Sequence, residues 1–396
     1  MEAGMLTEGL PPSCFEAPPF WKSGLAECHE FVTGLPGVEV EEIGRSAGGR
    51  PILAASFGRR EALRRSSTSM SSSFGGWGSK AWNPDTFYPP SFFGESPRER
   101  PVLVLQGNIH GSEIAGTVAA MNLLNLLVHG TDLRGRRHDR LLEEARKMRV
   151  IVIPHANPDG RARWEPAKHL LTASETQGHR VTFGLREDGT TPAWLETKNS
   201  FPMPMGRVLG SYFNDAGVNL QHDRFLDAGR APETDALLSF YLREMPDAVV
   251  AAHTDQGTLI SEAPSYIPVE LQTLCARIGG AVAGEVRRRR LPLFVYPHAN
   301  RPGAGTRAFT QLDAIYHQCG ALPLLVEFPS SIAEHLLTFD QVLDVGLAVF
   351  EALLVFGNDI GFRPGVRKHL NDGRVVRAYG PLPPPAAKET RGLREE

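Results

Sequence analysis

Short apolar runs bounded by turn residues recur along the chain, and they predict the strands of a buried sheet. Most of these runs show no polar alternation, which is typical of strands that are covered on both faces. Near the N-terminus an Ala-Gly-Gly turn joins two further strand-like stretches. The predicted strands lie within residues 37–58 (two strands), 101–107, 148–160, 248–257, 291–297 and 321–331.

Longer segments between these runs have apolar residues every three or four positions, and they predict helices. Because strands and helices alternate, the pattern predicts an α/β fold in which helices cover a mostly parallel or mixed sheet. The predicted helices are 113–130, 233–244, 269–289, 306–318 and 332–356.

Two stretches interrupt this alternation. Residues 57–100 are rich in Ser, Gly, Pro and aromatic residues, which predicts a long loop or insertion. The C-terminal extension, 361–396, ends in a stretch (380–396) that is Pro-rich and then charged, which predicts a mobile tail.

Composition narrows the range of partners. The 396 residues carry 42 Lys and Arg against 45 Asp and Glu, a net charge of -3. That balance gives no sign of nucleic acid or of an anionic membrane as a partner. The N-terminus lacks the basic and apolar regions of a signal peptide. The four cysteines are scattered without a Cys-x-x-Cys pair, so we expect reduced thiols and a cytoplasmic location. They are Cys14, Cys28, Cys275 and Cys319.

Polar residues with metal-binding potential follow three of the predicted strands. His110 and Glu113 come just after the strand at 101–107, His253 ends the strand AVVAAH, and Glu327 ends LPLLVE. Because ligands of open α/β sheets bind beyond the carboxyl ends of the strands, we expect these four side chains to converge.

The convergence favours a metal site over separate structural roles. Glu113 alone could stabilise a helix dipole, and His110 alone could cap a turn. Two imidazoles and one carboxylate, however, are good zinc ligands that leave a fourth position for water. Glu327 is costly to bury after an apolar strand without a partner, and water on the metal would be one. The set therefore predicts a metal-dependent hydrolase.

In this order, the motifs resemble those of the zinc carboxypeptidase family, the metallocarboxypeptidases of the carboxypeptidase A type. The matches are His-x-x-Glu at 110–113, Asn-Pro-Asp-Gly at 157–160, the strand-ending His253 and the later strand-ending Glu327. The segment IGRSAGGRPI is also similar to the start of the family's domain. The resemblance extends from about residue 25 to about residue 355.

The resemblance implies a mixed, mostly parallel sheet of about eight strands sandwiched by helices. It places a catalytic domain at 25–360, with the insertion 57–100, between extensions 1–24 and 361–396. It also implies one zinc ion held by His110, Glu113 and His253, with Glu327 as the general base of a water attack on a peptide or amide bond.

The segment that grips the substrate's terminal carboxylate departs from the family pattern. The family's GVDLNRNF reads GVNLQHDRF here, so the Asn-Arg pair becomes Gln221 and His222, and a bidentate arginine is lost. Asn219 replaces an Asp that supports a zinc-ligating His, and its amide oxygen can still accept a hydrogen bond. Tyr212 stands where the family commonly has an arginine that polarises the scissile carbonyl.

Other cations could bind the substrate instead. Arg307 lies in a family binding segment that lacks the expected Tyr, so Arg307 and His222 are the preferred candidates. Asp255 either supports the metal ligands or is a simple turn residue. Further arginines near the predicted site are either surface residues or substrate ligands; they are Arg161, Arg163, Arg224 and Arg301.

Three functions follow from this mixture of matches and departures. The first is a carboxypeptidase that removes C-terminal residues. The second is an amidohydrolase for N-acyl amino acids or for modified or cell-wall peptides, which the loss of the arginine favours. The third is a binding protein without catalysis, against which the retained Glu327 argues.

Overall fold

The computed structural model describes residues 2–61, 100–165, 167–170, 173–198, 208–255, 258–262, 264–267, 269–291, 294–295, 308–329, 337–362, 367–368 and 375–376. The predicted insertion 57–100 and the predicted tail 361–396 lie largely outside these residues.

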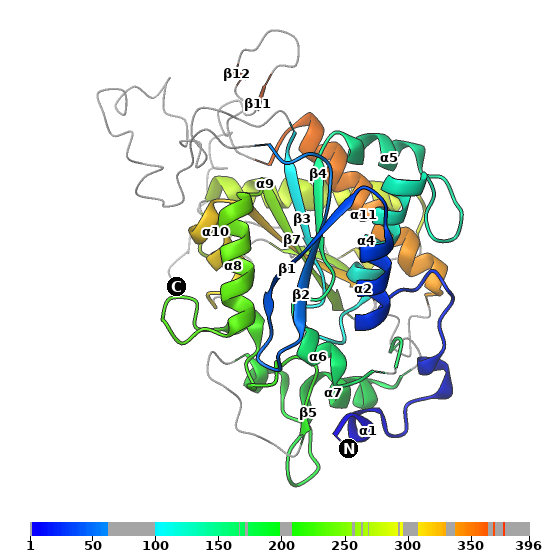
Figure 1. The fold of residues 1–396 in the computed structure, drawn as a ribbon, viewed down its shortest axis with the longest axis vertical. Coiled ribbons are helices and arrows are strands. Elements are labelled where there is room, and N and C mark those ends of the chain that lie inside the picture. Colours follow the sequence, from blue (N-terminus) through cyan, green and yellow to red (C-terminus); the bar gives the residue numbers. More distant parts are fainter. Residues whose placement is uncertain are drawn as a thin grey trace, which may run out of the picture.

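An eight-stranded mixed sheet forms the centre of the protein, as the sequence predicted (Figure 1). Its order is β1-β2-β4-β3-β7-β10-β8-β9. Strands β4, β3, β7 and β10 run parallel to one another, while β1, β2 and β8 join the sheet through antiparallel pairs. The strands are β1 (Val38–Arg45), β2 (Pro51–Phe57), β3 (Val102–Gln106), β4 (Arg149–Ile153), β7 (Ala248–Asp255), β8 (Thr258–Glu262), β9 (Phe294–Val295) and β10 (Leu322–Pro329).

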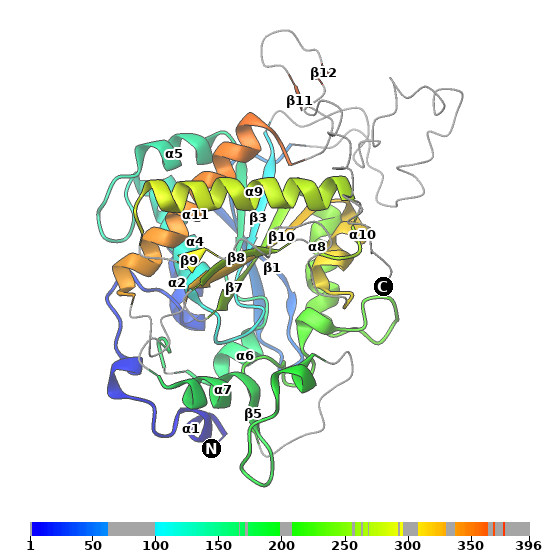
Figure 2. The same cartoon turned by 180° about the vertical axis from the view of Figure 1, so that it is seen from behind.

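Helices cover both faces of this sheet. One face carries α2 (Leu25–Gly34), α4 (Ala115–His129), α5 (Asp139–Arg146), α9 (Val269–Arg288) and α11 (Phe339–Asp359). The other face carries α8 (Pro232–Glu244) and α10 (Gln311–Cys319). In Figure 2, α4, α5 and α11 lie to the left of the strands, and α8 and α10 lie to the right.

The period-2 alternation of the strands divides the apolar residues into two cores. In β7, Ala248 and Val250 pack under α4, α9 and α11, whereas Val249 and Ala251 pack under α8 and α10. The same alternation carries His253, at the end of β7, onto the α8 and α10 face.

Short elements gather at the carboxyl edge of the parallel strands. Both views place α6 (Pro158–Ala162) and α7 (Glu175–Phe183) at that end of the sheet. The other short elements are α1 (Glu2–Thr7), η1 (Pro12–Phe15), β5 (Gly184–Leu185), η2 (Trp194–Thr197), β6 (Val208–Leu209), η3 (Leu220–His222), β11 (Arg367–Lys368) and β12 (Val375–Val376).

Two helices begin later than the periodicity predicted. α10 begins at Gln311 because Thr310 forms a reciprocal capping box with Asp313. α11 begins at Phe339, where Thr338 caps the helix through Gln341. β8 was not predicted, since its five residues lie too close to β7 to stand out as a separate run.

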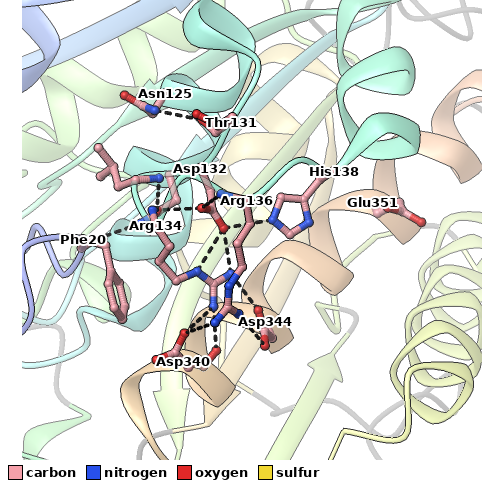
Figure 3. A network of polar contacts seen from close by, with 12 residues as sticks. Phe20, Asn125, Thr131, Asp132, Arg134, Arg136, His138, Asp340, Asp344 and Glu351 are labelled. Atoms are coloured by element: carbon pink, nitrogen blue, oxygen red, sulfur yellow. Dashed lines mark hydrogen bonds and ion pairs between the residues drawn. The ribbon is translucent and has the colours of Figure 1, made fainter.

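An ion-pair network built on the buried Asp132 and Arg134 fixes the loop between α4 and α5 against the start of α11 (Figure 3). The Arg134 guanidinium donates to Asp132 and to Asp340, and it pairs with Asp344 at 2.7 Å. His138 Nε2 lies 2.9 Å from the same Asp132 carboxylate. No helix among the described residues has the length and apolar character needed to cross a membrane.

Candidate active site

The loop after β3 is held by one asparagine. Asn108 adopts a left-handed backbone conformation with φ of 58°, which Asn tolerates better than most residues. Its Nδ2 donates to the carbonyls of His110, Gly111 and Glu113 at 2.9, 3.0 and 3.3 Å. The amide of Asn108 thereby sets the path of the His-x-x-Glu loop before any ligand binds.

Close backbone packing joins this loop to the Asn-Pro-Asp-Gly turn. A Cβ on Gly111 would lie 2.1 Å from the carbonyl carbon of Gly160, so only glycine fits there. The Gly111 N–H donates to the Ser211 carbonyl at 2.7 Å. The two sequence motifs and the segment before Asn219 therefore form one rigid unit.

His110, Glu113 and His253 bring three ligand atoms together. These atoms all lie within 4.8 Å of one another, and all three residues are buried. Glu113 Oε1 is 2.9 Å from His110 Nδ1, and Oε2 is 2.9 Å from His253 Nδ1. Both carboxylate oxygens of Glu113 therefore face an imidazole nitrogen inside a buried site. Two imidazoles gathered around one carboxylate in this way fit a site that a metal ion completes.

The electrostatics of this group favour the protonation states that a metal requires. Burial lowers the pKa of His110 below its ordinary 6.5, although Glu113 opposes this shift. Burial alone would raise the pKa of Glu113, but His110 and His253 outweigh that effect and lower it to about 2. At neutral pH the site therefore offers a carboxylate and a neutral His110.

The register between β10 and β7 places Glu327 next to the candidate metal ligand His253. It is the direct neighbour of His253 across the parallel pair of β10 and β7. Residues in register on adjacent strands point to the same face, so both side chains emerge on the α8 and α10 side. Glu327 is half-buried at the end of an otherwise buried strand.

The side-chain amide of Asn219 contacts both the His110 ring and a backbone carbonyl. Its Oδ1 is 3.2 Å from His110 Nε2, and its Nδ2 donates to the Thr197 carbonyl at 2.8 Å. The first contact favours the His110 tautomer with the proton on Nε2, which leaves Nδ1 for a metal. The second contact connects the metal site to η2.

The neighbouring wall contains the residues that replace the family's arginines. Tyr212 stacks on the His110 ring, with 3.7 Å between centroids and 13° between planes. His222 is buried, and burial followed by the charge of Lys198 lowers its pKa to about 3. The buried Gln221 Oε1 has no hydrogen-bond partner among the described residues. This wall is neutral at physiological pH.

Three of the arginines considered from the sequence are bound elsewhere. Arg161 is buried and donates to two backbone carbonyls. Arg163 donates to the Gly210 carbonyl and pairs with Asp215, so it holds the segment that carries Tyr212. Arg224 donates to a backbone carbonyl in its own loop. These contacts give the three arginines structural roles.

Two candidates fall on parts that the structure does not describe. Arg307 lies outside the described residues, as does Arg301. Asp255 is placed only by its backbone, which ends β7 opposite Pro329; its side chain lies outside the description.

Residues 26–261 match the family model that is described as "Zinc carboxypeptidase". This span is more than half of the sequence. The chain belongs to the zinc carboxypeptidase family. No curated protein sequence matches it.

The fold of this chain is similar to that of solved carboxypeptidase structures. A metallo-carboxypeptidase from Burkholderia cenocepacia superposes with a TM-score of 0.50 at 18% identity, over 84% of this chain and 68% of that one. Thrombin activatable fibrinolysis inhibitor superposes with a TM-score of 0.50 at 14% identity, over 88% of this chain and 82% of that one.

The donor set fits the metal that gives the zinc carboxypeptidase family its name. Two imidazole nitrogens and one carboxylate suit zinc, and the three groups are buried together. His110, Glu113 and His253 are therefore the residues that would hold the ion.

The sequence interpretation missed two residues of this site. Asn108 could have been found, because Gly-Asn directly after a buried strand signals a turn with positive φ. Thr197 had no such signal, because only the tertiary path of the chain brings η2 to Asn219.

Proposed function

We propose that this protein is a zinc-dependent hydrolase of the metallocarboxypeptidase type that cleaves a peptide or amide bond. The observation that carries the proposal is the buried convergence of His110, Glu113 and His253, with Glu327 in register beside His253. The three potential ligand atoms lie within 4.8 Å of one another in a buried site, which is the arrangement that a metal ion needs.

The residues divide the chemistry between them. A zinc ion bound here would supply Lewis acidity and lower the pKa of water. Glu327 takes a proton from the water that attacks the scissile carbonyl and passes that proton to the leaving amine. Asn219 holds the His110 ring in one orientation, and Tyr212 covers that ring on its face. Tyr212 can also donate a hydrogen bond to the developing oxyanion.

The first test is Glu327→Gln, which removes the base and keeps the shape. We expect hydrolysis to fall by about 10²- to 10⁴-fold, the usual contribution of a general base. Zinc content by mass spectrometry should stay equal to that of the wild type, because Glu327 is not a metal ligand in this proposal. Glu143→Gln, on the exposed side of α5, is the matched control. Unchanged hydrolysis in Glu327→Gln would contradict the proposed role.

A second candidate keeps the chemistry and changes the substrate. The neutral wall at His222 and Tyr212, in place of two arginines, favours an amidohydrolase for N-acyl amino acids or modified peptides. The two candidates are separated by comparing an N-acyl amino acid with a longer peptide that ends in the same residue. Faster cleavage of the peptide supports the carboxypeptidase.

A further inference from the structure

The loop formed by residues 212–219 contacts the His110 ring at both of its ends. Tyr212, the first residue of the loop, stacks on the face of the ring with 3.7 Å between centroids. Asn219, the last residue, places its Oδ1 3.2 Å from Nε2 at the edge of the same ring. The orientation of this candidate metal ligand therefore depends on where a single loop lies.

The 212–219 loop is held closed by its own residues. An antiparallel bridge joins Phe213 to Asn219. Asn214 Oδ1 accepts hydrogen bonds from the N–H groups of Ala216 and Val218 at 3.1 and 2.9 Å. Because the two ends are tied together in this way, the loop moves as one unit and its two contacts with the ring are coupled.

Asp215, in the middle of the loop, controls an arginine that brackets Tyr212. Asp215 Oδ1 accepts a hydrogen bond from Arg163 Nη2 at 2.6 Å. Arg163 Nη1 also donates to the carbonyls of Gly210 and Phe213. These two carbonyls flank Tyr212 along the chain, so the Asp215 carboxylate orients the guanidinium that fixes the backbone on both sides of the stacked ring.

The other side of Asp215 joins the loop to two segments outside it. Arg50 Nη1, in the turn before β2, donates to Asp215 Oδ2 at 2.6 Å and to Asp159 Oδ1 at 2.7 Å. The Asp215 N–H donates to Asp159 Oδ2 at 3.0 Å. Asp159 is fully buried in the Asn-Pro-Asp-Gly turn. The loop is therefore anchored at its middle to a rigid part of the molecule.

We propose that Asp215 is a positioning residue of the metal site, which fixes Tyr212 against the His110 ring through Arg163. Hydrogen bonds between a guanidinium and a carboxylate are strong and directional, so one carboxylate shared by two arginines can set the place of a loop. This inference rests on the proposed function, since it assigns a support for the same site.

The first measurement is metal affinity, which needs no substrate. Zinc binding to the metal-free protein is measured by competition with a chelator of known affinity. Asp215→Asn removes the charge and keeps the size, and it should weaken zinc binding by about 10-fold, the lower end of the range for residues that orient a metal ligand. Asp215→Glu keeps the charge and should bind zinc within about threefold of the wild type.

Two readouts separate positioning from a contribution to folding alone. Cobalt(II) accepts the same kinds of ligand as zinc, and its visible absorption bands respond to ligand orientation, so Asp215→Asn should shift these bands. In a Tyr212→Leu background, Asp215→Asn should weaken zinc binding by less than about twofold, because the residue through which Asp215 acts is absent. A loss of stability alone would lower the urea midpoint and leave the cobalt bands in place.

Two further variants complete the test. Asp227→Asn is the matched control, because Asp227 is an exposed acid that pairs with Arg224 at 3.9 Å, and its loss should leave zinc affinity unchanged. Arg163→Lys keeps a positive charge but loses the planar fork that binds a carboxylate and backbone carbonyls together. It should weaken zinc binding and shift the cobalt bands as Asp215→Asn does, and it replaces that variant if Asp215→Asn does not fold.

The outcomes distinguish this inference from the proposed function. Equal zinc affinity and identical cobalt bands in Asp215→Asn and the wild type would overturn the role of Asp215, as would an equal loss of affinity with and without Tyr212. Hydrolysis of a peptide by the wild type would still support the hydrolase in that case. Asp215-dependent metal binding by a wild type that cleaves neither peptides nor N-acyl amino acids would support the positioning role and refute the hydrolase.

Discussion

Asn219 makes two contacts that an aspartate could not make together. Its amide oxygen faces His110 Nε2, while its amide nitrogen donates to the Thr197 carbonyl. A carboxylate could make the first contact but would turn its second oxygen toward the carbonyl oxygen of Thr197. The Thr197 carbonyl needs a donor at this position, which explains the departure from the family's Asp.

Asn219→Asp should separate these two roles. We expect zinc content to be retained, because the acceptor for His110 remains. We expect the free energy of unfolding to fall by about 1–3 kcal/mol, because a buried carbonyl loses its donor. Metal analysis and urea unfolding measure the two effects, and an unchanged free energy of unfolding would show that the Thr197 carbonyl does not need this donor.

At the scale of elements, the loop between β3 and α4 is ordered by its own residues before the metal arrives. One amide of Asn108 serves three carbonyls, and Gly111 allows the loop to touch the turn at Gly160. Because His110 and Glu113 lie on this loop, its rigidity fixes the distance between two ligands. Ordering the ligands in advance lowers the entropy cost of metal binding.

Asn108→Ala tests this ordering. Loss of the amide donor and the cost of a left-handed alanine should lower the free energy of unfolding by about 2–4 kcal/mol. Zinc affinity should fall as well, because the ligand loop loses its fixed path. Asn108→Gly is the matched control, since it keeps the backbone conformation and removes only the amide. If both variants unfold at the wild-type urea concentration, the amide does not order the loop.

At the scale of the whole molecule, the network around Arg134 joins two elements that are distant in the sequence. It connects the loop between α4 and α5 to the start of α11. Burial would raise the pKa of Asp132, but hydrogen bonds from His138, Arg134 and the Arg136 N–H outweigh it and leave the pKa below 3.8. A depressed folded-state pKa contributes stability above pH 3.8, and this stability is lost as the pH falls through the folded-state value.

Asp132→Asn should therefore destabilise the protein by about 1–3 kcal/mol at pH 7, because Arg134 and His138 lose a buried charged acceptor while Arg134 keeps Asp340 and Asp344. The difference in unfolding free energy between wild type and variant should shrink below about pH 4. Asp139→Asn, an exposed pair with Arg137, is the control and should show a small effect at every pH. Urea unfolding at several pH values measures the difference, and a gap that widens on acidification would contradict the assigned direction.

Much of the fold could be predicted because local patterns decide it. The runs VLVL, VIVI and AVVAA are too apolar to lie anywhere but in a doubly covered sheet, and the structure places them in β3, β4 and β7. Boundaries were less predictable where a cap decided them, as at Thr310 and Thr338. β8 escaped prediction because a short strand beside a turn has little local signal.

The sequence by itself determined which residues could bind a metal, because His-x-x-Glu after a buried strand and His253 at the end of another place the donors at one edge of the sheet. Only the tertiary structure decided what surrounds them. Residues 193–198 carry no periodic pattern that points to the site, and their position depends on a hydrogen bond to a residue 22 positions away. Loop paths follow from such long-range contacts, so the support that Thr197 gives to Asn219 became visible only in the folded chain.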